Sequence, residues 1–154
     1  MDRERIGTYL RSAEETEQFG YELAHTLGPN TILALQGDLG AGKTTFVQGL
    51  AKGLGVADVV QSPTFTYLQI YEGSRLSLYH FDLYRLEKES DFIGLGFEEA
   101  FEAGGIVAIE WPGRIPSLIP SFAQEITFSH AEGQRVVSIG TWKERKQENQ
   151  GKPS

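Results

Sequence analysis

The chain contains no cysteine and no long apolar run. The absence of cysteine excludes disulfide bonds, thiolate nucleophiles and zinc–thiolate sites, and it is in keeping with a reducing compartment. No stretch approaches the ~18 consecutive apolar residues that a membrane-spanning helix requires. The first residues are charged and no apolar run follows them, so we expect no secretory signal and a cytoplasmic location.

Positive charge is also scarce, with 14 Lys and Arg against 21 Asp and Glu and a formal net charge of −7. Nucleic-acid binders neutralise phosphates with a basic face, so this balance argues against the chain gripping RNA or DNA by itself. The 154 residues suffice for one domain with a sizeable core. We expect one domain over residues 1–142 and a polar, disordered tail over residues 143–154, which lack apolar side chains to bury.

The apolar patterning predicts helices and strands in alternation. Ser12 and Glu15 form a capping box at the start of a first helix, and helical spacing continues to Leu27. Further helices are expected over residues 43–54 and 98–102. Buried strands are expected over residues 31–36 and 105–110, and hairpins over residues 64–71 with 76–82 and 124–129 with 135–141. The pattern indicates a three-layer α/β fold with a mixed parallel and antiparallel sheet.

One motif between a predicted strand and a predicted helix is typical of phosphate binding. The pattern G-x-x-x-x-G-K-[ST] is matched in full by Gly37, Asp38, Leu39, Gly40, Ala41, Gly42, Lys43 and Thr44. The glycines let successive backbone N–H groups face phosphate oxygens, and the helix adds its positive N-terminal end. Lys43 is expected at the β- and γ-phosphates and the Thr44 hydroxyl at Mg²⁺. The sequence therefore predicts a P-loop nucleotide-binding domain of the NTPase type.

Two acids follow predicted strands and are candidates to complete this site. Asp82 ends one strand and Glu110 ends the other, and ligands of open α/β sheets lie beyond the carboxyl ends of strands. One acid is expected to hold the metal and the other to orient the attacking water. The residues alone leave open which acid takes which role, and a solvent-facing acid is the alternative for each.

Two further features lie between or beside these elements. Residues 62–65 (Ser-Pro-Thr-Phe) are placed like a segment that senses the γ-phosphate, with Thr64 or Thr66 as the sensor. Trp111 precedes a proline, which favours an extended backbone and places its ring beside the candidate site. A turn with ordinary strand threonines is the alternative for the first feature. For Trp111, the residues alone favour a tryptophan that only packs.

Two basic residues near Asp82 receive structural interpretations. His80 shares the strand face of Asp82 and is interpreted as a packed histidine, with contact to the nucleotide site as the alternative. Arg85 is interpreted as one half of a surface ion pair, with charge stabilisation at the site as the alternative.

Four motifs in this order resemble those of the bacterial TsaE (YjeE) family. They are residues 37–45 (Gly-Asp-Leu-Gly-Ala-Gly-Lys-Thr-Thr), 62–65 (Ser-Pro-Thr-Phe), 80–85 (His-Phe-Asp-Leu-Tyr-Arg) and 110–112 (Glu-Trp-Pro). The phosphate loop alone is generic, whereas the four together are specific and span nearly the whole chain apart from its tail.

The resemblance implies a small ATPase that uses ATP, with ADP as product, and Mg²⁺. The family takes part in making threonylcarbamoyladenosine at position 37 of transfer RNAs that read codons starting with A. Its members dock on the TsaB–TsaD pair, in which TsaD performs the transfer, and hydrolysis is expected to reset that complex. Transfer RNA is then met only through the complex, and no membrane is involved.

The resemblance also implies roles for individual residues. Lys43, Thr44 and Thr45 belong to the phosphate and magnesium site, Glu110 corresponds to the metal-linked acid, and Asp82 to the other functional acid. Trp111 corresponds to the functional aromatic, and Thr64 falls in the switch-like segment. The contacts to adenine fall on Ser12, Ala13 and Arg135.

Two other function classes are compatible with the same loop. A small-molecule kinase usually carries an arginine-bearing lid, and no arginine-rich insertion is present. A nucleotide-gated binding module would bind without turnover. Phosphate release with and without the TsaB–TsaD pair separates these alternatives from a partner-activated ATPase.

Overall fold

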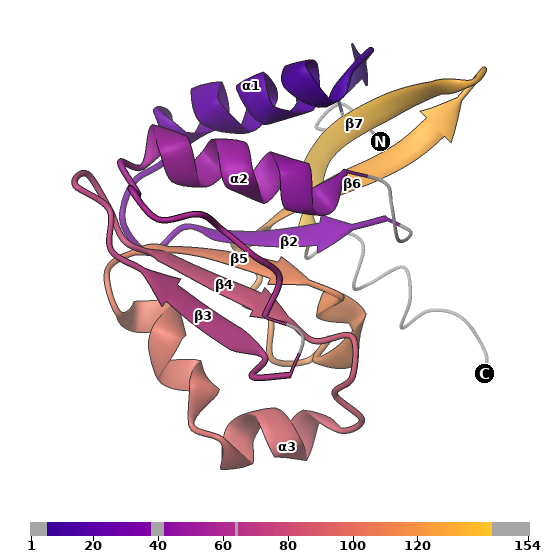
Figure 1. The fold of residues 1–154 in the computed structure, drawn as a ribbon. Helices are drawn as coiled ribbons and strands as arrows, with labels where there is room; N and C mark the ends of the chain where they lie inside the picture. Colours follow the sequence, from indigo (N-terminus) through magenta and orange to yellow (C-terminus); the bar gives the residue numbers. More distant parts are fainter. Residues whose placement is uncertain (1–5, 38–41, 64, 143–154) are drawn as a thin grey trace, which may run out of the picture.

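A mixed seven-stranded sheet organises the computed structural model, which describes residues 6–37, 42–63 and 65–142 (Figure 1). Its strand order is β1-β7-β6-β2-β5-β4-β3. The strands are β1 (Ile6–Leu10), β2 (Ile32–Gln36), β3 (Leu68–Tyr71), β4 (Leu78–Asp82), β5 (Ile106–Glu110), β6 (Gln124–Ala131) and β7 (Gln134–Thr141). β6, β2, β5 and β4 run parallel to one another, while β3, β7 and β1 are antiparallel additions. The carboxyl ends of the four parallel strands therefore meet at one edge.

Helices cover the sheet on both faces. In Figure 1, α1 (Ala13–Ala24) and α2 (Lys43–Gly53) lie side by side on one face, and α3 (Glu89–Gly94) lies beyond the other. Two short 3₁₀ helices, η1 (Phe97–Glu102) and η2 (Pro112–Arg114), flank β5 in the sequence. Each face has its own apolar core, and β2 and β5 contribute alternate residues to both. The three-layer α/β fold with a mixed sheet, which the sequence predicts, is confirmed.

Several predicted bounds differ from the structure for local reasons. The strand expected from residue 64 begins only at Leu68, because residues 65–67 form a turn in which the Tyr67 N–H donates to the Pro63 carbonyl at 3.1 Å. Tyr67 also has a positive φ of 67°, which no strand residue adopts. The first helix ends at Ala24 rather than residue 27, since the Thr26 hydroxyl bonds back to the Leu23 carbonyl and closes a turn there.

Three elements were not predicted. One depends on a contact with a distant part of the chain, and the other two are very short. β1 forms only by pairing with β7 at the far end of the chain. α3 has six residues and η2 three, which is too short for a helical repeat of apolar side chains to be visible. The second helix, in contrast, begins at Lys43 as predicted.

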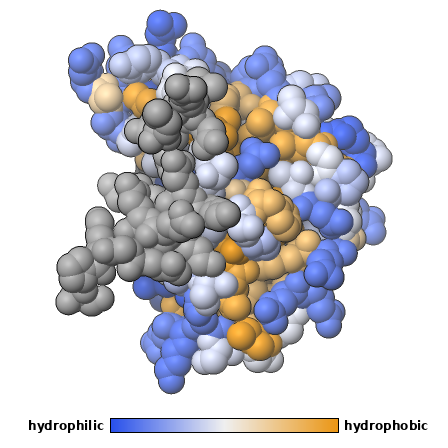
Figure 2. Space-filling view, turned by 180° about the vertical axis from the view of Figure 1, so that it is seen from behind, coloured by the Kyte–Doolittle hydropathy of each residue, from blue (hydrophilic) through white to orange (hydrophobic). Residues whose placement is uncertain are grey.

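The surface is predominantly polar with apolar groups between the charges. In Figure 2, which shows the side opposite to Figure 1, apolar residues gather towards the middle of the face and hydrophilic ones border them. Val59 and Phe65 are the most exposed large hydrophobic side chains, at 77% and 78%. Among the described residues, no helix is both long and apolar enough to cross a bilayer.

Glycines bring α1 and α2 into close contact. A Cβ atom at Gly49 would overlap the backbone carbonyl of Glu17, and one at Gly53 would overlap the carbonyl of Tyr21. The two helix backbones therefore touch directly at these points. This contact fixes the start of α1 relative to α2, and both helix starts contribute to the site described below.

Replacing Gly49 with alanine is expected to lower the free energy of unfolding by about 1–3 kcal/mol, because the added methyl must force the helices apart. Urea denaturation measures this change. Gly94→Ala is the matched control: Gly94 also lies in a helix, nothing lies within 4 Å of its added Cβ, and alanine there is expected to be neutral or stabilising by up to about 1 kcal/mol. Equal stability of the two variants would contradict the close helix contact.

Candidate functional site

The chain passes from β2 into α2 through a left-handed glycine. Gly42 caps α2 with φ 104° and ψ 9°, a backbone that residues with a Cβ rarely adopt. Lys43 is the first helical residue and is 5% exposed. Its ammonium group donates to the Gly37 carbonyl at 2.7 Å and lies 4.3 Å from the centre of the Trp111 ring. Asp38, Leu39, Gly40 and Ala41 lie outside the described residues.

The two acids from the sequence analysis are direct neighbours. Asp82 and Glu110 face each other in the register of β4 and β5, at the carboxyl edge of the sheet. Asp82 is 9% exposed and Glu110 is 4% exposed, so both carboxylates are largely removed from solvent. Neither is the solvent-facing acid that was the alternative interpretation.

The two acids have different surroundings. Both oxygens of Asp82 accept hydrogen bonds, Oδ2 from the Ser62 hydroxyl at 2.6 Å and Oδ1 from the Tyr84 N–H at 3.1 Å. Glu110 Oε2 lies 2.8 Å from His80 Nε2. The Ser62 contact ties the segment that follows α2 to the end of β4. Sequence spacing could not reveal the Ser62–Asp82 or the His80–Glu110 contact, because the two residues of each pair come from different strands or loops.

A pocket of about 220 Å³ lies where these elements meet. Its lining combines the start of α1, the start of α2, the end of β5 and the last hairpin through Ala13, Gly42, Lys43, Thr44, Thr45, Glu110 and Arg135. Seven residues that the sequence analysis assigned to one site thus share one cavity. Asp82 and Trp111 are not in its lining.

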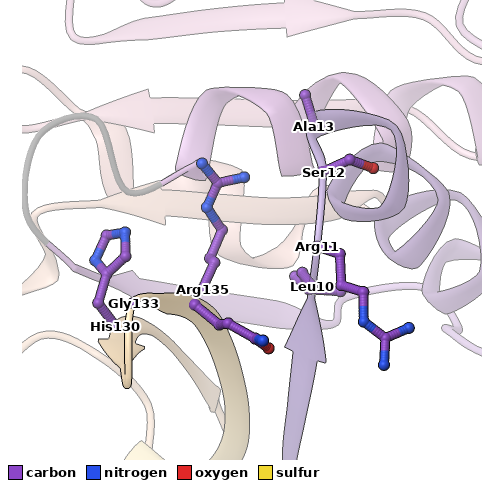
Figure 3. Close-up of a pocket in the computed structure, with 8 residues that line it drawn as sticks. Leu10, Arg11, Ser12, Ala13, His130, Gly133 and Arg135 are labelled. Atoms are coloured by element: carbon purple, nitrogen blue, oxygen red, sulfur yellow. The ribbon is translucent and has the colours of Figure 1, made fainter.

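A second pocket of about 370 Å³ adjoins the first and shares Ala13 and Arg135 with it. Figure 3 shows Arg135 beside His130 and facing the start of α1, whereas Arg11 points away from both. Arg135 Nη1 donates to the Thr16 hydroxyl at 3.1 Å, while no described residue accepts a hydrogen bond from its buried Nε. The guanidinium therefore lies at the junction of the two pockets and carries a buried donor without a described partner.

Trp111 corrects one expectation from the sequence. Its backbone is left-handed, with φ 61° and ψ 51°, rather than extended. The chain turns here into η2, where the Arg114 N–H donates to the Trp111 carbonyl at 3.1 Å. Its ring is held by Tyr84, with centroids 5.0 Å apart, and by the ammonium group of Lys43. A non-glycine residue persists in this conformation only when its surroundings hold it, and such residues cluster at functional sites.

Of the remaining candidates, Thr66 and Arg85 line neither of these two pockets. Thr64 lies outside the described residues, and Thr66 is exposed with its hydroxyl 3.4 Å from the Leu68 carbonyl. Arg85 does not form the expected ion pair with any described residue; its guanidinium lies 5.0 Å from the centre of the Phe65 ring instead. A cation over an exposed ring gains from the ring quadrupole without needing an acid nearby.

Comparison with known proteins places these features in a family. The model of the family described as threonylcarbamoyl adenosine biosynthesis protein TsaE matches residues 10–137, most of the chain. The chain belongs to the TsaE family. A role in threonylcarbamoyladenosine biosynthesis is therefore the role of its family.

Individual relatives agree with the family match. A curated relative in Treponema pallidum, named tRNA threonylcarbamoyladenosine biosynthesis protein TsaE, is 42% identical over 84% of this chain and 96% of its own length. One of the same name in Bacillus subtilis is 42% identical over 82% of this chain and 79% of its own length. The crystal structure of Bacillus subtilis YdiB is 31% identical, with a TM-score of 0.77 over 94% of this chain and 90% of that one.

The residues of the pocket fit a nucleotide with magnesium. Mg²⁺ takes hard oxygen ligands and is usually held by one or two carboxylates together with phosphates and water. The Thr44 hydroxyl and the Glu110 carboxylate line the same pocket and are ligands of this kind. The described residues contain no cluster of three or more His, Asp or Glu able to hold a metal.

Proposed function

We propose that this chain binds ATP with Mg²⁺ in the two adjoining pockets and hydrolyses it in the service of the TsaB–TsaD complex. This hydrolysis resets the complex between rounds. It thereby supports formation of the threonylcarbamoyl group on adenosine 37 of tRNAs that read codons starting with A. The observation that carries the proposal is the cavity shared by Lys43, Thr44, Glu110 and Arg135 beside the start of α2. We place this activity in the cytoplasm, where ATP and tRNA meet.

The phosphates are assigned to the start of α2. Helix N-termini attract anions through their free N–H groups and dipole, and Gly42 leaves that end open. In the structure, the buried Lys43 ammonium donates to a backbone carbonyl and rests on an aromatic ring. These are weaker partners than phosphate oxygens, so Lys43 is expected to exchange them for the β- and γ-phosphates.

The chemistry is in-line attack of water on the γ-phosphorus. The new P–O bond forms as the bond to the β–γ bridging oxygen breaks, which releases ADP and inorganic phosphate. Mg²⁺, held by Thr44 and Glu110, would neutralise charge on the phosphate oxygens. Lys43 stabilises the same developing charge, and Asp82 at the neighbouring strand end is assigned to water positioning.

The base and ribose are assigned to the second pocket. Its volume of about 370 Å³ suits a nucleoside, and it continues from the phosphate pocket through Ala13 and Arg135. The Nε donor of Arg135, which has no hydrogen-bond partner in the described part of the chain, lies at this junction, where phosphate or ribose oxygens would accept from it.

Replacing Arg135 with methionine is expected to weaken ADP binding by about 10-fold or more, because a hydrogen bond to a charged group contributes about 1.5–3 kcal/mol. Calorimetric titration with ADP measures the change. Arg85→Met is the matched control, since Arg85 is exposed and lines neither pocket. A loss in Arg135→Met no larger than in the control would contradict the assignment.

Protein partners are expected to complete the site. The Ser62–Asp82 hydrogen bond connects one acid to a segment that also carries the highly exposed Phe65. A partner that contacts this segment can thereby alter the position of Asp82. The net charge of −7 supports contact with proteins, with tRNA bound by the complex.

Phosphate release with and without the TsaB–TsaD pair tests the function. Slow release by the chain alone and stimulation by the pair are expected. Transfer of phosphate to a metabolite would instead identify a kinase, and docking that depends on nucleotide without any release would identify a binding module. Either result would overturn the proposal.

A further inference from the structure

His80 is buried in the middle of β4, between Gln69 of β3 and Ala108 of β5. Its side chain is 0% exposed. Because side chains alternate along a strand, it lies on the same face of β4 as Asp82, the face that α1 and α2 cover. It does not line either nucleotide pocket, so it cannot touch a ligand there. Among the described residues, its side chain makes a polar contact with Glu110, two strand positions further along β5 than Ala108.

The geometry of this contact determines which nitrogen of the imidazole ring carries a hydrogen. His80 Nε2 lies 2.8 Å from Glu110 Oε2, and a carboxylate oxygen can only accept. Nε2 must therefore carry the hydrogen. No described residue gives the other nitrogen, Nδ1, a hydrogen-bond partner, so it is best accommodated as a bare lone pair.

The contact with His80 restrains the flexible side chain of Glu110 at the edge of the phosphate pocket. A glutamate side chain has three rotatable bonds, and Glu110 stands at the end of its strand. Engaging Oε2 with a donor that is itself fixed within the sheet leaves Oε1 as the oxygen for a ligand in the pocket. Carboxylates that ligate metals are commonly held in this manner by a further hydrogen bond.

We propose that His80 is a positioning residue that orients the Glu110 carboxylate towards nucleotide-bound magnesium through its Nε2–H. The proposal rests on the assignment of Glu110 to the magnesium site in the proposed function. It assigns His80 no contact with substrate, so its effect must pass through Glu110.

The test compares His80→Phe, which keeps an aromatic ring of similar size but no donor, with His80→Gln, whose amide nitrogen can occupy the place of Nε2. ADP affinity is measured by calorimetry with Mg²⁺ and with EDTA. In His80→Phe, the gain in affinity that Mg²⁺ provides is expected to fall by about 10–100-fold, with affinity in EDTA unchanged. His80→Gln is expected to recover most of that gain.

Three outcomes would overturn the proposal: a full magnesium gain in His80→Phe, an equal loss with and without Mg²⁺, or no recovery in His80→Gln. Failure of the proposed function is distinguishable, because wild type would then show no magnesium-dependent nucleotide binding. Should His80→Phe fail to fold, ¹⁵N NMR of wild-type imidazoles decides. A proton on Nε2 of His80, with a signal that shifts in Glu110→Gln, is expected, and a proton on Nδ1 alone would contradict it.

Discussion

Lys43→Met is expected to reduce the affinity for ADP by about 10–100-fold, which corresponds to the loss of about 1.5–3 kcal/mol in charge-assisted hydrogen bonds to phosphate. Methionine keeps an unbranched apolar side chain against the Trp111 ring, so the packing of the aliphatic stem is retained. Calorimetric titration measures the affinity, and thermal unfolding establishes that the variant is folded.

Lys52→Met is the matched control because Lys52 belongs to the same helix but has a side chain that is 66% exposed and paired with Glu17. An exposed ion pair contributes little to stability, and Lys52 lines neither nucleotide pocket. Its affinity for ADP is expected to equal that of wild type. If Lys43→Met also bound ADP like wild type, the placement of the phosphates at the start of α2 would be wrong.

Glu110→Gln and Asp82→Asn are expected to fail in different ways. Glu110 lines the phosphate pocket, so removing its charge should abolish most of the affinity gained from Mg²⁺ and lower turnover by about 10²–10³-fold. Asp82 already accepts hydrogen bonds at both oxygens and lies outside that lining. Asp82→Asn should therefore lower turnover while leaving the magnesium-dependent affinity largely intact.

Both measurements belong to one experiment, with nucleotide titration at several Mg²⁺ concentrations and phosphate release in the presence of the TsaB–TsaD pair. Glu98→Gln, an exposed carboxylate on η1, serves as the control and is expected to behave like wild type. The roles of the two acids would have to be exchanged if Asp82→Asn alone lost the effect of Mg²⁺. Wild-type turnover in both variants would remove them from the reaction.

The sequence allowed most of the sheet and both large helices to be predicted, because their apolar residues repeat regularly. The strands β2 and β5 are continuous apolar runs, and the glycines before α2 mark its start at Lys43. β1 escaped prediction because its stability derives from pairing with β7, more than a hundred residues away. The strand β3 was predicted too long because residues 65–67 contain no residue type typical of the turn that they form at Tyr67.

The candidate site shows the same division. Residues within one motif, such as Lys43 and Thr44, could be named from spacing alone. Contacts between motifs could not, because strand register and loop packing decide them. Examples of such contacts are the Ser62 bond to Asp82 and the His80 bond to Glu110. The left-handed backbone of Trp111 could not be predicted from its own motif either.

The central claim is that a nucleotide with magnesium binds at the start of α2, and the most direct measurement is calorimetric titration of the wild-type chain with ADP and Mg²⁺. Saturable binding at one site per chain is expected, with an affinity that falls when EDTA removes the metal. Undetectable binding at millimolar nucleotide would contradict the account.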